Sequence, residues 1–327
     1  MIDIRHLVMM TLDPVHIGLG GYSLGRVDNA IVREPGTNLP KIPGTSLIGA
    51  ARNYAAMRYG KPSAAGLHKE FKGGVEQCPI IYTFGTASES GGGRAGTVSI
   101  SDAQLLFFPV SSSAGPVWVS TRRTLEAAGF NVEEDDKNST KNPTTLKLEK
   151  NGEKNGKKKN RKKNAINLGW LMVPVKQGLR ITPPPGMEQA WSEINERIVM
   201  ISPNLFSEVV NSNLEVRTSV AIDPETGTAE DGALFTYEAI PRATWLWCDL
   251  IENDYIQEFP RTEHQFDANL KKENGGEPLG ETWNRPLHVA RAGLALMKYL
   301  GVGGMSTRGF GRVDVICGLE DEPDAAS

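Results

Sequence analysis

The chain has 327 residues, three cysteines and a formal net charge of −3. Hydrophobic residues make up 39% of it and charged residues 23%, which is typical of a globular protein with a buried core. The widely spaced cysteines exclude a disulfide scaffold and a cysteine-rich zinc site, and the charge balance excludes a uniformly basic polyanion binder. No apolar run approaches the roughly 18 residues of a membrane span, and no signal peptide is apparent. We therefore expect a cytoplasmic protein without a membrane partner.

Strands and helices alternate along the chain. Strands are predicted over residues 5–12, 97–108, 167–173, 243–251 and 312–317. Helices are predicted over residues 45–59, 121–128, 187–200 and 286–300. Thr45 or Ser46 is expected to cap the first helix, and Thr121 the second. This order is typical of an α+β fold in which helices cover one face of an antiparallel sheet.

A long hairpin is predicted within residues 211–240. Asn213–Ala221 and Ala233–Tyr237 are strand-like, and the segment Asp223–Gly227 between them is a strong turn sequence. An ordinary surface hairpin and a protruding arm both fit these residues. The polar tip favours an arm, because packing would gain it little.

Charge is distributed unevenly along the chain. Residues 137–163 contain eleven Lys or Arg and two Glu, a net charge of +9 that leaves −12 for the other 300 residues. So few apolar residues cannot offset the entropy of ordering, and we expect a disordered basic insertion that is a solvated loop, a nucleic-acid contact or both. The end of the chain, 318–327, is expected to be an acidic tail.

Glycines gather in two segments that have different meanings. Gly91–Gly96 matches G-x-G-x-x-G, but a strand follows it, so no helix N-terminus is available for a dinucleotide. The segment Gly301–Arg312 lies between a helix and a strand and also carries hydroxyl and arginine side chains. A flexible turn is one interpretation, and a backbone that approaches nucleic-acid phosphates is the one we favour.

The first loop, residues 16–45, is also long and rich in glycine. Long loops in compact domains are usually functional or disordered. The candidate nucleic-acid-binding residues lie in these two segments and in the first predicted helix: Gly25, Arg26, Arg33, Lys41, Ser46, Arg52, Gly303, Gly304, Met305, Ser306, Thr307, Arg308, Gly309 and Arg312.

Several motifs resemble one protein family. They are I-P-G-T-S-L-I-G-A-A-R at Ile42–Arg52, G-G-M-S-T-R-G-F-G-R at Gly303–Arg312 and G-R-V-D-N-A-I-V-R-E at Gly25–Glu34. They resemble the RAMP superfamily of CRISPR-Cas proteins and, more narrowly, the backbone subunit of the type III-B (Cmr) effector complex. The resemblance implies a single RAMP-type domain over 1–327, with an RRM-like, ferredoxin-like palm, inserted finger segments and a β-hairpin thumb. The basic insertion matches no motif of the family.

The resemblance also implies a function. Copies of such a subunit stack in a helical filament on a CRISPR guide RNA, together with other subunits of the type III complex. The thumbs interrupt the duplex between the guide and a single-stranded target RNA, and the target is cut at regular intervals. In the family, an aspartate of the first loop is used for this cleavage, and Asp28 matches its position.

The chemistry of RNA cleavage suits such a site. The 2′-OH of RNA can attack the adjacent phosphorus when it is held in line, so catalysis consists of positioning, proton transfer and charge neutralisation. Asp28 can ligate Mg²⁺ or Mn²⁺ or accept the proton, and His16 is a second acid–base candidate. The alternative for Asp28 is a turn residue.

Two other functions remain open at this point. One is a purely structural RNA-binding subunit without catalysis. The other is a metabolic enzyme whose glycine-rich loops bind a small phosphorylated ligand.

Overall fold

The computed structural model describes residues 2–20, 27–66, 78–86, 93–134, 144–145, 165–174, 176–177, 179–260, 262–263 and 282–319. The chain forms two compact units. Unit 1 comprises Met1–Ile17, Ile42–Ala103 and Cys248–Ser327, and unit 2 comprises Gly18–Lys41 and Gln104–Trp247. Gly25 and Arg26, most of the basic insertion and residues 320–327 lie outside the described part of the chain.

Unit 1 is built on strands from both ends of the chain. Strand β1 (Ile2–Thr11) pairs antiparallel with β17 (Val313–Cys317), with Met10 opposite Asp314. The second part of β14 (Trp245–Asn253) lies on the other side of β1 and pairs antiparallel with β2 (Val98–Ile100). A separate short pair is formed by β15 (Thr262–Glu263) and β16 (Thr282–Trp283). The sheet thus brings the last strand of the chain beside the first.

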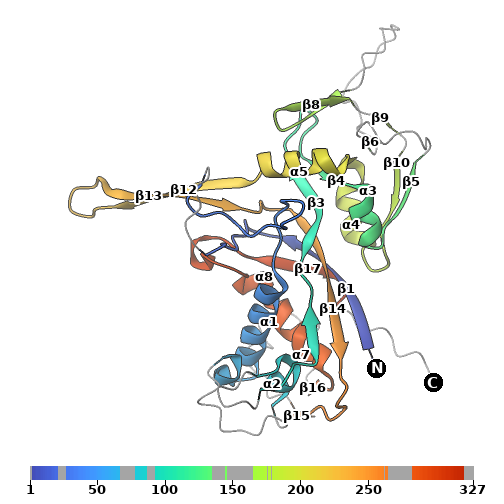
Figure 1. Ribbon diagram of the computed structural model, residues 1–327, viewed down its shortest axis with the longest axis vertical. Helices are drawn as coiled ribbons and strands as arrows, with labels where there is room; N and C mark the ends of the chain where they lie inside the picture. Colours follow the sequence, from blue (N-terminus) through green and yellow to red (C-terminus); the bar gives the residue numbers. More distant parts are fainter. Residues whose placement is uncertain are drawn as a thin grey trace. The chain divides into compact units, whose positions relative to one another are not determined.

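The helices of unit 1 pack mainly on one another (Figure 1). They are α1 (Gly44–Arg58), α2 (Pro79–Phe84), α7 (Pro286–Ala295) and α8 (Met297–Leu300), with 3-10 turns at Pro62–Ala65 and Ser306–Arg308. Helix α1 lies against α7 so closely that a Cβ on Gly293 would be 1.9 Å from the Ala51 carbonyl oxygen. Leu287, Ala290 and Leu294 recur at helical spacing along α7 and form an apolar stripe that is buried.

Unit 2 has a mixed sheet. Its order is β14, β3 (Gln104–Val110), β4 (Val117–Ser120), β11 (Ile198–Met200), β6 (Thr144–Thr145) and β9 (Lys176–Gln177). The β4–β11 and β6–β9 pairs are parallel, and the others are antiparallel. Two short antiparallel pairs add β5 (Asn131–Glu134) with β10 (Leu179–Thr182), and β7 (Ala165–Leu168) with β8 (Leu171–Pro174).

Three helices complete unit 2: α3 (Arg122–Ala127), α4 (Glu188–Ile194) and α5 (Pro203–Ser212), with a 3-10 turn at Asn195–Arg197. Aromatic rings form part of its core, because Phe107 packs against the rings of Phe130, Trp191 and Trp245. None of the helices in the described part of the chain is long and apolar enough to cross a membrane.

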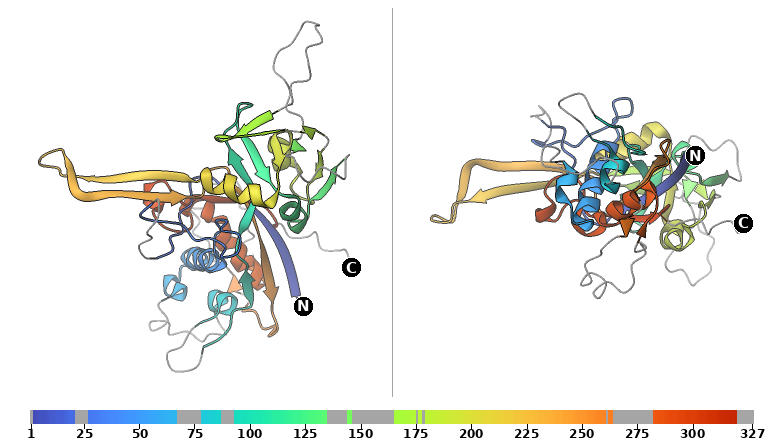
Figure 2. Two further views of the ribbon diagram at one scale, coloured as in Figure 1. Left: turned by 45° about the horizontal axis from the view of Figure 1, so that its top comes forward. Right: turned by 90° about the horizontal axis from the view of Figure 1, so that it is seen from below.

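The predicted hairpin is present in unit 2. Strands β12 (Glu215–Ile222) and β13 (Ala229–Ala239) pair antiparallel, with Thr218 opposite Thr236. Both views of Figure 2 show it projecting from the other elements of unit 2, and most described side chains of β12 are exposed. The structure therefore matches the protruding arm rather than a hairpin packed on the surface.

Three predicted elements are wrong. The predicted strand 97–108 is two strands, because Asp102 leaves the strand path to accept a hydrogen bond from the Gly44 amide at 2.8 Å. That carboxylate meets the start of α1, so neither Thr45 nor Ser46 caps the helix. The predicted strand 167–173 is the β7–β8 hairpin, which turns at Gly169 with a positive φ. The predicted helix 187–200 ends early and continues into β11.

Candidate functional site

The first loop is hydrogen-bonded to the foot of the hairpin, the part of β13 around Thr236 and Glu238. The Asn29 amide donates to the Thr236 carbonyl at 3.0 Å, and the Glu238 amide donates to the Asn29 carbonyl at 3.0 Å. The backbone of residues 27–31 therefore runs along the inner part of β13. This attachment fixes where the loop presents its side chains within unit 2.

Asp28 is held by a single residue of the hairpin. Its Oδ2 accepts hydrogen bonds from the Thr236 amide and from the Thr236 hydroxyl, both at 2.8 Å. The Asp28 amide donates in return to the Thr236 hydroxyl at 3.0 Å. These bonds hold the pKa of Asp28 below its ordinary value of 3.8, because they stabilise the ionised form. Asp28 is exposed, so it is an anion oriented by the hairpin and open to a ligand.

Arg33 fastens the same loop at a second point. Its guanidinium forms an ion pair with Glu238 at 2.6 Å and hydrogen bonds with the Asn211 side chain and the Asn38 carbonyl. The side chains of Arg33 and Glu238 are only 20% and 12% exposed. Lys41 forms an ion pair with Glu34 at 2.9 Å. In this structure both predicted RNA-binding cations therefore stabilise the loop itself.

The C-terminal glycine-rich segment forms an exposed loop in unit 1. Buried Val302 and Phe310 anchor its two ends, and the Val302 amide donates to the Gly311 carbonyl at 2.8 Å. Between these anchors all residues are exposed except Met305, which is half-buried. The loop thus exposes Ser306, Thr307 and Arg308, whose hydroxyl and guanidinium groups are donors suited to phosphates.

Gly303 is the position where this loop needs glycine most. Its φ is +85°, and a Cβ there would be 2.4 Å from Ile17 Cδ1 and 2.6 Å from the His16 carbonyl oxygen. The neighbouring Gly304 amide donates to that same oxygen at 3.0 Å. His16, which is 8% exposed, therefore supports the glycine-rich loop through its backbone.

Two other predicted residues of unit 1 have side-chain partners within the chain, and a third is half-buried. Arg52 donates from two nitrogens to the Ala64 carbonyl at 3.0 and 2.9 Å, and burial lowers its pKa. Arg312 forms an ion pair with Asp13 at 2.5 Å that raises the pKa of the arginine. Ser46 is half-buried in the first turn of α1. Phosphate contacts for them remain predictions.

The described residues do not by themselves form a metal-binding site. No group of three His, Cys, Asp or Glu side chains in that part of the chain is placed to hold a metal ion. Asp28 supplies one carboxylate, and one of its oxygens already accepts two hydrogen bonds.

Sequence comparison identifies the family. The model of the RAMP superfamily matches residues 8–314. The chain belongs to the RAMP superfamily. This RAMP protein is 29% identical over 320 residues, covering 94% of the chain and 93% of the relative, to the CRISPR system Cmr endoribonuclease Cmr4 of Pyrococcus furiosus. It is 33% identical over 94 residues, 28% of the chain and 41% of the relative, to the endoribonuclease Csm3 of the Cms system of Enterococcus italicus.

The fold agrees with solved structures. A cryo-EM structure of type III-B Cmr-beta bound to cognate target RNA matches with a TM-score of 0.59 at 16% identity, covering 96% of both chains. The crystal structure of oligomeric Cmr4 from Pyrococcus furiosus matches with a TM-score of 0.53 at 19% identity, covering 96% of this chain and 98% of that one. The predicted α+β RAMP fold is therefore confirmed.

Proposed function

We propose that this RAMP protein is the guide-RNA-binding backbone subunit of a type III CRISPR effector complex and cleaves complementary target RNA at regular intervals. Its relatives named as endoribonucleases support the activity. The placement of Asp28 at the foot of the projecting hairpin is the observation that carries the catalytic assignment. The partners in this proposal are the guide RNA, a single-stranded target RNA, copies of the chain and other subunits of the complex.

The reaction is transesterification within the target RNA. The 2′-oxygen attacks the adjacent phosphorus, the bond from phosphorus to the 5′-oxygen breaks, and a 2′,3′-cyclic phosphate and a 5′-hydroxyl result. The 2′-hydroxyl proton is released, and the leaving 5′-oxygen gains a proton. Positioning of these atoms in line is the main requirement, and a hairpin that disrupts the duplex can supply it.

The depressed pKa of Asp28 argues against a role as the general base. An efficient general base has a pKa near the working pH, and the Thr236 bonds move the pKa of Asp28 further from neutrality. Asp28 therefore acts as a fixed anion that orients the attacking 2′-hydroxyl by accepting its hydrogen bond. In this proposal His16 stays the candidate acid–base group.

The metal requirement is a separate part of the proposal. Mg²⁺ often binds one or two carboxylates together with substrate phosphates. Mg²⁺ or Mn²⁺ would then be held by Asp28 and by phosphate oxygens of the bound RNA. Chelation with EDTA should stop cleavage in the assembled complex. Full activity after chelation would show that cleavage does not require a metal ion.

Matched threonine variants test whether the hairpin positions Asp28. Thr236→Val removes the hydroxyl that bonds to Asp28, and Thr218→Val makes the same change on the facing strand, at a described residue that forms no hydrogen bond with Asp28. We expect Thr236→Val to slow cleavage about tenfold, with guide binding unchanged, and Thr218→Val to match the parent. Equal cleavage by both variants would reject the positioning role.

The second candidate function is a structural subunit without catalysis. It is favoured by the bonds between Asp28 and Thr236, since they give the carboxylate a role in joining loop to hairpin. Assembly on guide RNA with no spaced cleavage products from the complex would support this alternative.

A further inference from the structure

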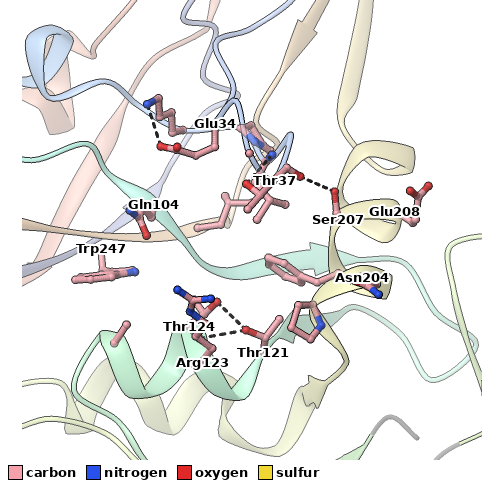
Figure 3. Close-up of a pocket in the computed structure, with 18 residues that line it drawn as sticks. Glu34, Thr37, Gln104, Thr121, Arg123, Thr124, Asn204, Ser207, Glu208 and Trp247 are labelled. Carbon is pink, nitrogen blue, oxygen red and sulfur yellow. Dashed lines mark hydrogen bonds and ion pairs between the residues drawn. The ribbon is translucent and has the colours of Figure 1, made fainter. Parts of the chain in front are cut away.

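Unit 2 contains a cavity that the proposed function does not use. Its volume is about 630 Å³, within the range of small-molecule sites. Figure 3 shows the turn of the first loop along one side, with Glu34 and Thr37, and helix α3 along the opposite side, with Thr121, Arg123 and Thr124. Helix α5 contributes a third side. Asp28 and the glycine-rich loop are not among its lining residues.

One end of the cavity combines an aromatic ring with an amide. Trp247 and Gln104 lie together there (Figure 3). Within the described part of the chain, the Trp247 indole N–H has no acceptor and the Gln104 side-chain amide has no hydrogen-bond partner. A flat ring beside an amide with both donor and acceptor suits a nucleobase, through stacking and hydrogen bonds to its edge.

The cavity also offers an unneutralised cation. Arg123 is exposed and forms no ion pair or hydrogen bond with any residue that the structure describes, and Figure 3 shows its side chain on the same side as Trp247. Lys41 is already paired with Glu34 at 2.9 Å, and the Glu208 carboxylate is turned away from the centre. A guanidinium matches the geometry of phosphate oxygens.

We propose that this cavity binds a nucleotide, with the base against Trp247, the base edge on Gln104 and the phosphate on Arg123. The nucleotide is either free or an unpaired nucleotide of an RNA strand. This inference goes beyond the proposed function, because it requires neither Asp28 nor the glycine-rich loop.

Calorimetry on the full chain tests the site with each of the four nucleoside 5′-monophosphates as the probe. We expect at least one to bind, and Arg123→Gln to weaken it about tenfold or more, the loss typical of a charged hydrogen bond. Arg180→Gln is the matched control, since Arg180 is 81% exposed, lies in unit 2 and does not line the cavity. Gln104→Leu should change the order of affinity among the four bases.

A single-stranded RNA of the preferred base distinguishes the two sources. If it displaces the monophosphate from the parent but not from Arg123→Gln, the ligand is an unpaired nucleotide of a strand; if it displaces nothing, the ligand is a free nucleotide. The proposal is overturned if Arg123→Gln and Arg180→Gln bind monophosphates and RNA equally, or if nothing binds. Guide-RNA assembly and target cleavage, measured on the same variants, report separately on the proposed function.

Discussion

The glycines of the glycine-rich loop differ in how strongly an alanine side chain would disturb the backbone. Alanine substitutions at these glycines should therefore weaken guide-RNA binding to different degrees. Gly303 has φ +85° and backbone within 2.6 Å of an added Cβ. Gly309 has φ +79°, but an added Cβ would meet nothing within 4 Å; Gly304 has no positive φ, and an added Cβ there would have no neighbour closer than 3.8 Å. Replacing each with alanine therefore separates steric overlap from backbone strain.

The magnitudes follow from these two causes. A side chain in the left-handed region costs roughly 1–2 kcal/mol, and overpacking against fixed atoms adds about 1–3 kcal/mol. Gly303→Ala should thus strain the loop by roughly 2–5 kcal/mol, and Gly309→Ala by about 1 kcal/mol. Gly304→Ala should be neutral or slightly stabilising, because alanine restricts the unfolded chain.

Fluorescence anisotropy with labelled guide RNA measures the consequence. If guide-RNA binding requires the parent backbone conformation, the strain energy of each variant is subtracted from its binding free energy. Each loss of about 1.4 kcal/mol weakens binding tenfold. We expect Gly303→Ala to lose about 30-fold or more, Gly309→Ala to lose a few-fold, and Gly304→Ala to bind like the parent. Parent-like binding by Gly303→Ala, or equal losses for all three variants, would refute a role for the loop backbone in RNA binding.

Three further predictions follow from the site and the core. Glu238→Gln should lower the free energy of unfolding by about 2–3 kcal/mol in urea titrations, because it leaves half-buried Arg33 without its anion; no coupling in the double-mutant cycle with Arg33→Gln would contradict this. Burial raises the pKa of Cys248 to about 12, so its thiol should react with iodoacetamide at pH 7 only upon unfolding, and rapid labelling of the folded chain would show otherwise. Because the Thr236 bonds lower the pKa of Asp28, its attachment to the hairpin is complete above the unfolded pKa and is lost as pH falls through the folded pKa, below 3.8. The cleavage rate should consequently show no inflection from Asp28 above about pH 5; an inflection near neutrality that Asp28→Asn removes would contradict the low pKa.

Local signals predicted the elements that local contacts determine. Thr121 caps α3 by accepting from the Thr124 amide at 3.1 Å, as expected. The stripe along α7 is buried, and the turn at Asp223–Gly227 joins the hairpin strands, with the Gly227 amide donating to the Asp223 carbonyl. In each case the deciding residues lie within a few positions of one another.

The features that the sequence did not predict depend on contacts between residues far apart in the chain. The break in the predicted strand 97–108 depends on Asp102 bonding to Gly44, 58 positions away. The partner of Asp28 is 208 positions away, so sequence reasoning identified the aspartate through a family motif but missed Thr236. Glu238 was missed for the same reason, although an acid within an otherwise apolar strand segment is a signal for a buried ion pair.

The proposed cleavage depends most directly on the negative charge of Asp28, and one kinetic measurement tests this dependence. Asn at position 28 keeps an oxygen that accepts from Thr236 but removes the negative charge. The measurement is the single-turnover rate of target cleavage by complexes assembled with Asp28→Asn and with the parent at equal guide-RNA content. We predict intact assembly with cleavage at every spaced position reduced at least about 100-fold. Cleavage at the parent rate would contradict the assignment of Asp28.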